Sequence, residues 1–306
     1  MGLALLFPGQ GAQFVGMGAD LYRSHPPSKS IFDRASEQVD FDLLGVCFEG
    51  PEEALAKTAA CQVAIYVTSL AAWGFWKEQT ATPEPAVSAG LSLGEYTALT
   101  IAGALSFEEG LDLVSRRGAL MQKACEERPG TMASVIGLSA EAVEGALEGV
   151  DGVVQVANYN SPSQVVLTGE EGAVRRAADR CKEMGAKRVL ELSVAGAYHS
   201  PLMKPAEEAL RPRLAEASIR PPTHPVILNV TGRESKDPEL IRDGLIRQVT
   251  SPVRWSESMS RLRDLGVDGA IEMGPGRILR GLMRQIDRGL PVESLCSMES
   301  IQAEGK

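Results

Sequence analysis

The stretch Gly90-Leu-Ser-Leu-Gly94 places a serine, Ser92, between two glycines in the pattern G-x-S-x-G. The apolar run over 85–89 predicts a strand before this stretch, and the run over 95–104 predicts a helix after it. A sharp turn between a strand and a helix lifts a serine hydroxyl out of the fold, and small flanking residues let the backbone bend that tightly. Ser92 is therefore the candidate nucleophile.

A serine nucleophile needs a base, and the chain has only three histidines. We expect His25, in the proline-rich segment SHPPS, to be a solvated loop residue, and His224, in PPTHPV, to be structural. His199 follows small residues in SVAGAYHSP, at the predicted start of a helix. A histidine at such a boundary is often only a hydrogen-bonded filler. His199 is nevertheless the candidate base, because the other two positions suit that role less well.

The negative oxygen of a tetrahedral intermediate needs hydrogen-bond donors. In folds with this serine turn, one donor is the backbone N–H of the next residue, here Leu93. The loop LFPGQGAQ offers a second backbone N–H, that of Gln10 between two glycines. A dinucleotide-binding turn is the alternative for this loop, but Phe14 stands where the third glycine of G-x-G-x-x-G belongs. A nicotinamide cofactor is therefore not expected.

Two adjacent arginines, Arg116 and Arg117, lie in the predicted helix EEGLDLVSRRGALMQKAC. Neighbouring helix positions point about 100° apart, so only one of the two can face the interior. A buried arginine near the serine would suit a substrate that ends in a carboxylate, held by two parallel hydrogen bonds. Two arginines on a solvated helix face are the alternative, and the residues alone leave both open.

Length and composition are those of a globular protein, with 306 residues, 44% of them hydrophobic and 23% charged. We find no apolar run that approaches the roughly 20 residues of a membrane helix and no basic leader, so we expect no membrane anchor and a cytoplasmic location. Five scattered cysteines without CxxC spacing predict free thiols and no metal site. The net charge of −9 argues against nucleic-acid binding.

Alternating strands and helices predict an α/β fold. The expected strands include 3–7, 87–90, 226–230 and 270–273, and the expected helices include 62–78, 108–125, 201–217 and 278–286. Between about 130 and 195 the order becomes βαββαβ, which is typical of a ferredoxin-like unit. We therefore predict a ferredoxin-like small domain over 129–195, inserted into a larger α/β domain over 1–128 and 196–306.

Seven segments together carry a family resemblance: FPGQGAQ, GLSLGEYTAL, SRRGALMQ, ANYNSP, AYHSPLM, PVRW and EMGPGRIL. In their order and approximate spacing, the chain resembles the malonyl-CoA:acyl-carrier-protein transacylase family from about residue 5 to residue 297. The resemblance implies a hydrolase-like α/β domain with a parallel central sheet and a ferredoxin-like insertion. It also implies malonyl transfer from coenzyme A to the phosphopantetheine thiol of an acyl carrier protein, for fatty-acid synthesis, through a malonyl-serine intermediate.

The resemblance also implies roles for the matching residues. Ser92 would be the nucleophile and His199 the base that later acts as the acid. The main-chain N–H groups of Gln10 and Leu93 would form the oxyanion hole. The main-chain carbonyl of Gln248 would orient the histidine, in a Ser–His dyad without an acidic third member.

Substrate contacts follow from the same resemblance. Arg117 would hold the malonyl carboxylate, and Asn160 would line the cleft between the domains. Leu93 and Tyr198 fit the malonyl-selective pattern, although Tyr198 replaces the more usual Phe. Leu91 departs from the family, which usually has a histidine there, so the neighbour of the nucleophile is apolar in this chain.

The implied partner is an acyl carrier protein and the implied donor a coenzyme A thioester, with no metal or redox cofactor and a monomeric enzyme. Alternatives are a free-standing loader for a polyketide synthase, a serine thioester hydrolase, and a non-catalytic scaffold suggested by the missing histidine. An acidic carrier protein would need a local basic patch on this acidic enzyme. Two clusters are candidates, the first being preferred: Arg175, Arg176, Arg180, Lys182, Lys187 and Arg188 in the small domain, and Arg277, Arg280 and Arg284 near the C-terminus.

Overall fold

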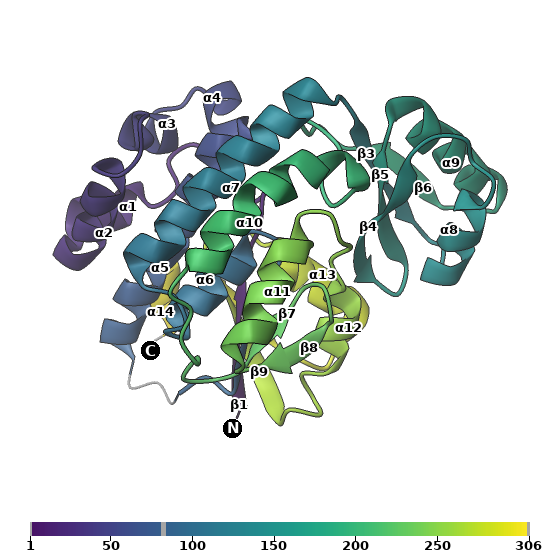
Figure 1. The fold of residues 1–306 in the computed structure, drawn as a ribbon. Helices are drawn as coiled ribbons and strands as arrows, with labels where there is room; N and C mark the ends of the chain where they lie inside the picture. Colours follow the sequence, from purple (N-terminus) through teal and green to yellow (C-terminus); the bar gives the residue numbers. More distant parts are fainter. Residues whose placement is uncertain (1, 81–83, 305–306) are drawn as a thin grey trace.

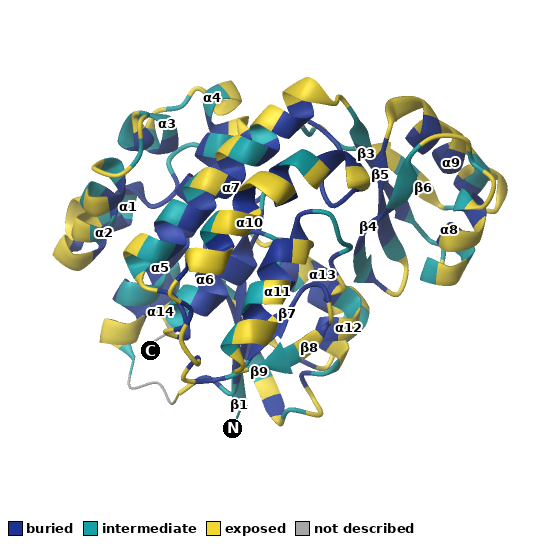
Figure 2. Cartoon of the chain, in the orientation of Figure 1, coloured by how far each residue is buried: buried dark blue, intermediate teal, exposed yellow. Residues whose placement is uncertain are grey.

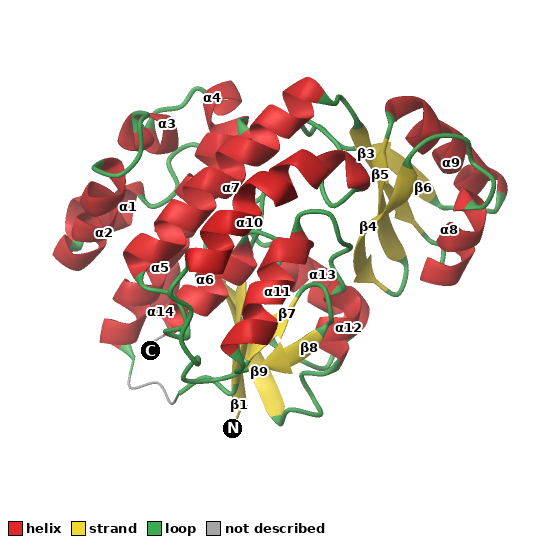
Figure 3. Cartoon of the chain, in the orientation of Figure 1, coloured by secondary structure: helices red, strands yellow, loops and turns green. Residues whose placement is uncertain are grey.

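The computed structural model describes residues 2–80 and 84–304, which contain two separate sheets (Figure 1 and Figure 3). Within these residues, the larger sheet has six strands in the order β10-β9-β1-β2-β7-β8. Neighbouring strands are parallel except for the β7–β8 pair, which confirms the predicted parallel central sheet. The strands are β1 (Gly2–Phe7), β2 (Val87–Gly90), β7 (Val226–Leu228), β8 (Arg233–Ser235), β9 (Val267–Met273) and β10 (Val292–Leu295).

The helices of the larger domain are α1 (Ala19–Ser24), α2 (Pro26–Ser36), α3 (Leu43–Phe48), α4 (Glu52–Ala56), α5 (Thr58–Gln79), α6 (Gly94–Ile101), α7 (Phe107–Glu127), α10 (Lys204–Glu216), α11 (Pro238–Gln248), α12 (Trp255–Ser260), α13 (Ile278–Ile286) and α14 (Met298–Glu304). Helices cover both faces of the central sheet. Leu5 and Phe7 of β1 belong to a core shared with α5 and α7, whereas Ala4 and Leu6 belong to a core shared with α12 and α13. Burial on both faces explains why β1 is a nearly continuous apolar run.

The helix α5 corrects one expectation about membrane segments. By length and composition Thr58–Gln79 could cross a membrane, so the sequence does hold an apolar run of that size. However, 83% of its most apolar 18-residue window is buried inside the protein. The helix is apolar on all sides because other elements of the larger domain surround it, which is typical of a core helix.

The second sheet belongs to the small domain. Its elements are β3 (Thr131–Ile136), α8 (Ala140–Leu147), β4 (Val154–Ser161), β5 (Gln164–Gly169), α9 (Glu171–Glu183) and β6 (Arg188–Glu191). The strands pair antiparallel in the order β4-β5-β3-β6, which confirms the ferredoxin-like arrangement. The inner faces of α8 and α9 are buried and their outer faces are exposed (Figure 2).

The two domains meet along β4. The Tyr159 N–H donates to the Val253 carbonyl over 2.9 Å, and the Val253 N–H donates to the Ala157 carbonyl over 2.8 Å. The predicted domain limits at 128/129 and 195/196 stay predictions, and the outer limits 1 and 306 lie outside the described residues. This contact places the edge of the small sheet beside the segment that leads into α12.

The longest helices, α5 and α7, were expected from the sequence, whereas many of the short elements were not. The strand 87–90 and the helix 278–286 have the predicted limits, whereas the expected helix 201–217 is divided into a 3-10 turn (Pro201–Met203) and α10. The elements that were not among the expected ones are the helices α1 to α4, α11, α12 and α14 and the strands β8 and β10. Each of these is three to eleven residues long, so periodicity gives little indication of them.

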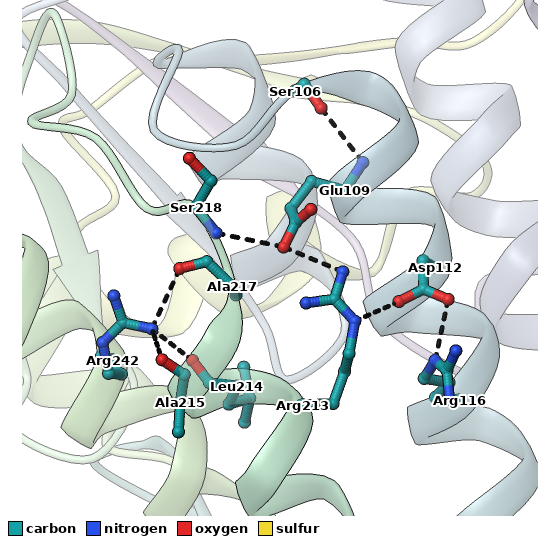
Figure 4. A network of polar contacts seen from close by, with 10 residues as sticks. All are labelled: Ser106, Glu109, Asp112, Arg116, Arg213, Leu214, Ala215, Ala217, Ser218 and Arg242. Carbon is teal, nitrogen blue, oxygen red and sulfur yellow. Dashed lines mark hydrogen bonds and ion pairs between the residues drawn. The ribbon is translucent and has the colours of Figure 1, made fainter.

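Ion pairs fix the helix that carries the two arginines (Figure 4). Arg213 on α10 contacts two carboxylates on α7, Glu109 at 2.9 Å and Asp112 at 2.6 Å. Arg116 also pairs with Asp112, at 2.8 Å, on the outer side of α7. Arg117, by contrast, is 1% exposed. The prediction that only one arginine faces the interior is therefore confirmed.

Candidate active site

Ser92 occupies the sharp turn between β2 and α6. Its φ of 53° lies in the left-handed region, which costs energy for a residue with a side chain. The flanking glycines are needed for close backbone contacts. A Cβ on Gly90 would lie 1.9 Å from the backbone of Gly94, and a Cβ on Gly94 would lie 2.1 Å from the Phe7 carbonyl oxygen. The strand–turn–helix context predicted for G-x-S-x-G is therefore present.

Asn229, which follows β7, holds this turn. Its Oδ1 accepts a hydrogen bond from the Ser92 N–H over 2.7 Å, and its Nδ2 donates to the Gly90 carbonyl over 2.7 Å. The side chain is buried at 3% exposure. Sequence reasoning missed this residue; the available indication was a polar residue at the carboxyl end of a strand predicted to be buried.

The structure brings Ser92 and His199 together. Ser92 Oγ lies 2.8 Å from His199 Nε2, and His199 Nδ1 lies 2.9 Å from the Gln248 carbonyl oxygen and 3.2 Å from that of Ser251. Because carbonyl oxygens only accept, Nδ1 carries the proton and Nε2 is free to accept the serine hydroxyl proton. Burial and the charge of Arg117 lower the pKa of His199 to about 4, so the imidazole is a neutral base at neutral pH.

Arg117 points into the same site from α7. Its Nη2 donates to Ser92 Oγ over 2.9 Å and to Gln248 Oε1 over 3.0 Å, and its Nη1 donates to Gln62 Oε1 over 2.6 Å. The guanidinium lies over the Tyr96 ring, 5.6 Å from its centroid. No carboxylate among the described residues forms an ion pair with Arg117, so the group is a buried cation held by neutral acceptors. Such a cation can bind the carboxylate of a substrate.

Three further buried polar residues hold this arrangement, and sequence reasoning missed the roles of all three side chains. Gln62 positions Arg117, while the Gln248 side chain donates to the Ser92 carbonyl over 3.0 Å and to Glu95 Oε2 over 2.7 Å. Glu95 is fully buried, and burial raises its pKa to about 7. Gln62 and Glu95 are polar residues in otherwise apolar helices, which is the pattern that could have identified them.

The candidate oxyanion donors lie beside the nucleophile. Within the described residues, neither the Gln10 N–H nor the Leu93 N–H has a hydrogen-bond acceptor, and Leu93 stands at the start of α6. The Gln10 side chain donates to the Tyr198 hydroxyl over 3.3 Å, and this hydroxyl lies 2.5 Å from Thr58 Oγ1. The hydroxyl that distinguishes Tyr198 from Phe therefore connects the Gln10 loop to α5.

Leu91 and Asn160 line the pocket in front of Ser92. The Leu91 N–H donates to the Phe7 carbonyl over 3.0 Å, so the backbone at this position is held independently of its side chain. The Asn160 Oδ1 atom is buried and has no hydrogen-bond partner among the described residues. An unpaired buried acceptor facing a pocket can receive a hydrogen bond from a bound ligand.

The pocket has a volume of about 190 Å³ and lies between the two domains. The small domain contributes one wall and α13 another, and the residues named above form the base. The walls include Met132, Asn158, Gln164, Val166, Leu192, Val194, Ile278 and Leu282. Among the residues that the structure describes, no group of three or more His, Cys, Asp or Glu could hold a metal ion.

The other two histidines are outside this site. His224 Nε2 lies 2.6 Å from Ser88 Oγ, as expected for a structural residue. The expectation for His25 was wrong, because this residue is buried at 8% exposure and not solvated. It accepts the Ser28 N–H at the start of α2 and contacts Glu78 at 2.9 Å, so it is a helix cap.

Comparisons with known proteins place these observations in a family. The family model described as "Acyl transferase domain" matches residues 4–296. The malonyl CoA-acyl carrier protein transacylase of Bacillus subtilis strain 168 is 41% identical over 303 residues, which cover 98% of this chain and 95% of that relative. The Escherichia coli K12 protein of the same name is 42% identical over 296 residues and 95% of each chain.

Solved structures agree with this assignment. An acyl carrier protein S-malonyltransferase from Vibrio cholerae superposes with a TM-score of 0.94 at 43% identity, covering 99% of this chain and 100% of that one. A malonyl-transacylase complex with a type II PKS acyl-carrier protein gives a TM-score of 0.95 at 40% identity, with both chains fully covered. The chain thus belongs to the acyl transferase domain family and, within it, to the malonyl CoA-acyl carrier protein transacylases.

Proposed function

We propose that the protein transfers a malonyl group from malonyl-CoA to the phosphopantetheine thiol of an acyl carrier protein and so supplies fatty-acid synthesis. One observation carries this proposal: the buried guanidinium of Arg117 and the imidazole of His199 both contact Ser92 Oγ, at 2.9 and 2.8 Å. A nucleophile beside a cation without its own ion pair suits an acyl group that ends in a carboxylate. The names of the relatives support the same donor and acceptor.

In the first half-reaction, Ser92 Oγ bonds to the thioester carbon while its proton passes to His199 Nε2. The main-chain N–H groups of Gln10 and Leu93 stabilise the oxyanion. The C–S bond then breaks, and the coenzyme A thiolate takes the proton from His199. In the second half-reaction, the carrier thiol gives its proton to His199 Nε2 and its sulfur bonds to the ester carbon. The C–O bond to Ser92 then breaks, and Ser92 Oγ takes the proton back from His199.

We propose that no metal or redox cofactor takes part, because the acyl carbon keeps its oxidation state. The first half-reaction replaces its C–S bond with a C–O bond, and the second half-reaction replaces that C–O bond with a new C–S bond. Arg117 holds the distal carboxylate, and Asn160 offers its unpaired Oδ1 atom to the substrate from the small domain. We further propose that the enzyme works as a cytoplasmic monomer. The nucleophile, the base, the oxyanion donors and the substrate contacts border one pocket of a single chain: Ser92, His199, Gln10, Leu93, Arg117 and Asn160.

The docking surface for the carrier protein is best placed on α13. Its residues Ile278 and Leu282 line the active-site pocket, and no residue of α9 does. Within the described residues, Arg277, Arg280 and Arg284 form no ion pair or side-chain hydrogen bond. This arrangement favours the C-terminal cluster for an acidic partner.

The small-domain cluster, which the sequence favoured, is largely engaged within the protein. Arg175 pairs with Glu171 at 2.7 Å, and Lys182 pairs with Asp179 at 2.8 Å. Arg176 donates to the Asp151 carbonyl over 2.6 Å and Arg180 to that of Glu148 over 2.6 Å. Ion pairs thus offset two of the six positive charges, and main-chain carbonyls hold two more of the side chains, which leaves fewer of them free to meet a partner.

The test is a transfer assay with malonyl-CoA and a phosphopantetheinylated acyl carrier protein, followed by mass spectrometry of the carrier and of free malonate. We expect the carrier to gain one malonyl group at a rate that exceeds malonate release. Release of free malonate at the same rate with or without carrier would instead identify a thioester hydrolase.

A further inference from the structure

The steps proposed above do not use Glu95, a buried carboxyl group next to the active site. Glu95 lies in the first turn of α6, three residues after Ser92, and is fully buried. Its Oε2 atom accepts hydrogen bonds from Gln248 Nε2 over 2.7 Å and from the Asn229 N–H over 3.1 Å. Its Oε1 atom has no hydrogen-bond partner among the described residues. A buried carboxylate oxygen without a donor disfavours the ionised form.

A single side-chain amide connects Glu95 to Arg117. Gln248 donates to Glu95 through Nε2 and accepts from Arg117 Nη2 through Oε1, over 3.0 Å. The amide therefore lies between a buried cation and a buried carboxyl group. The same residue offers its main-chain carbonyl to His199, so the position of Gln248 affects the base as well.

The other titratable groups packed around this pair are neutral at neutral pH. Burial raises the pKa of the Tyr96 phenol to about 12, and burial lowers the pKa of His199 to about 4. Burial raises the pKa of Glu95 to about 7, against the hydrogen bonds of Gln248 and Asn229 and the charge of Arg117. Glu95 is therefore the group whose charge responds to events at Arg117.

We propose that ionised Glu95 offsets the charge of Arg117 across the Gln248 amide, without direct contact, in the unloaded enzyme and takes up one proton from solvent when the carboxylate of the acyl group binds the guanidinium. This proposal rests on the proposed function, since the incoming carboxylate is that of malonyl. Two carboxylates and one guanidinium would leave an uncompensated buried negative charge, which is strongly unfavourable. An O–H bond formed at Glu95 removes that charge. Glu95 acts through Gln248 and is thus a positioning residue.

The experiment measures the equilibrium between free enzyme and acyl-enzyme by intact-mass spectrometry after acid quenching. The enzyme is incubated with malonyl-CoA and coenzyme A, or with acetyl-CoA and coenzyme A, between pH 6 and pH 8. The acetyl series corrects for titration of the coenzyme A thiol and phosphates, which both donors share. With one proton taken up by a group of pKa about 7, the malonyl-to-acetyl ratio of equilibrium constants should fall about tenfold over this range.

Two variants make the test specific. In Glu95→Gln the amide mimics the neutral carboxylic acid, so the ratio should not change with pH. Glu272→Gln is the matched control, because Glu272 is also fully buried but accepts hydrogen bonds with both oxygens, from the Leu279 N–H, the Arg280 N–H and Ser294. This control should keep the slope of the parent protein.

A flat ratio in the parent protein would overturn the proposal, as would an unchanged slope in Glu95→Gln. The parent series alone decides the matter if Glu95→Gln does not fold. Failure of the proposed function has a different signature: either no malonyl adduct forms at any pH, or the adduct is lost to water as free malonate at the same rate with and without carrier protein.

Discussion

Replacement of Asn229 by alanine tests how the nucleophile is held. The Asn229 side chain makes two hydrogen bonds of 2.7 Å to the backbone on either side of Leu91, at the Ser92 N–H and the Gly90 carbonyl. Alanine leaves the part-buried Ser92 N–H and the buried Gly90 carbonyl without this partner, and each such group costs about 1–3 kcal/mol. The free energy of unfolding should therefore fall by about 2–6 kcal/mol.

The activity of Asn229→Ala should fall as well. The positive φ of Ser92 is held by its surroundings, and relaxation would move Oγ away from its 2.8 Å contact with His199. A displacement of about 1 Å can cost about 100-fold in rate. We therefore expect loading by malonyl-CoA to slow by about 10- to 100-fold at a temperature where the variant is folded, as measured by quenched-flow mass spectrometry.

Ser88→Ala is the control for Asn229→Ala. Ser88 lies on β2, the strand that leads into the Ser92 turn. Its hydroxyl is 2.6 Å from His224 Nε2, so alanine removes a buried hydrogen bond away from the site. Its unfolding free energy should fall by about 1–3 kcal/mol with no change in loading rate. If folded Asn229→Ala loads at the parent rate, the Asn229 side chain does not hold Ser92 in its reactive position.

Three further predictions concern the base, the carboxylate site and the partner. Because the pKa of His199 in the free enzyme is lowered to about 4 and the neutral form is the base, kcat/KM for loading should change little from pH 7 to about pH 5 and decrease below about pH 4; a decrease centred near pH 6.5 would contradict this. Arg117→Ala should lower the malonyl-to-acetyl loading ratio at least about 30-fold, since a carboxylate that loses its buried partner costs about 2–5 kcal/mol, whereas equal loss for both acyl groups would indicate a structural role. Arg284→Glu should raise KM for the carrier protein and weaken its salt dependence, while Arg176→Glu should leave KM unchanged; the reverse order would favour the small domain.

The sequence was informative where a local pattern dictates geometry. The glycines around Ser92 are required by contacts of 1.9 and 2.1 Å that a Cβ would make, so the turn could be predicted from the motif alone. The alternation of apolar and polar residues likewise predicted the long strands and helices. His199 was found because the chain has only three histidines and the other two had less suitable positions, whereas Arg117 was singled out of the Arg116–Arg117 pair by the family resemblance.

The sequence was uninformative where contacts join distant segments. Asn229 contacts Ser92 across 137 positions, and Glu95 contacts Gln248 across 153, so no local spacing indicates these pairs. His25 was misjudged for the same reason, because its partner Glu78 is 53 positions away. The preference between the two basic clusters also depended on tertiary structure, which determines whether each side chain already has a partner.

Intact-mass spectrometry shows directly whether Ser92 carries the malonyl group. The protein is mixed with malonyl-CoA in the absence of any acceptor and quenched with acid, in parallel with Ser92→Ala. We expect one malonyl adduct on the parent protein and none on Ser92→Ala, with circular dichroism showing that both are folded. An adduct of equal yield on Ser92→Ala would show that another residue carries the malonyl group.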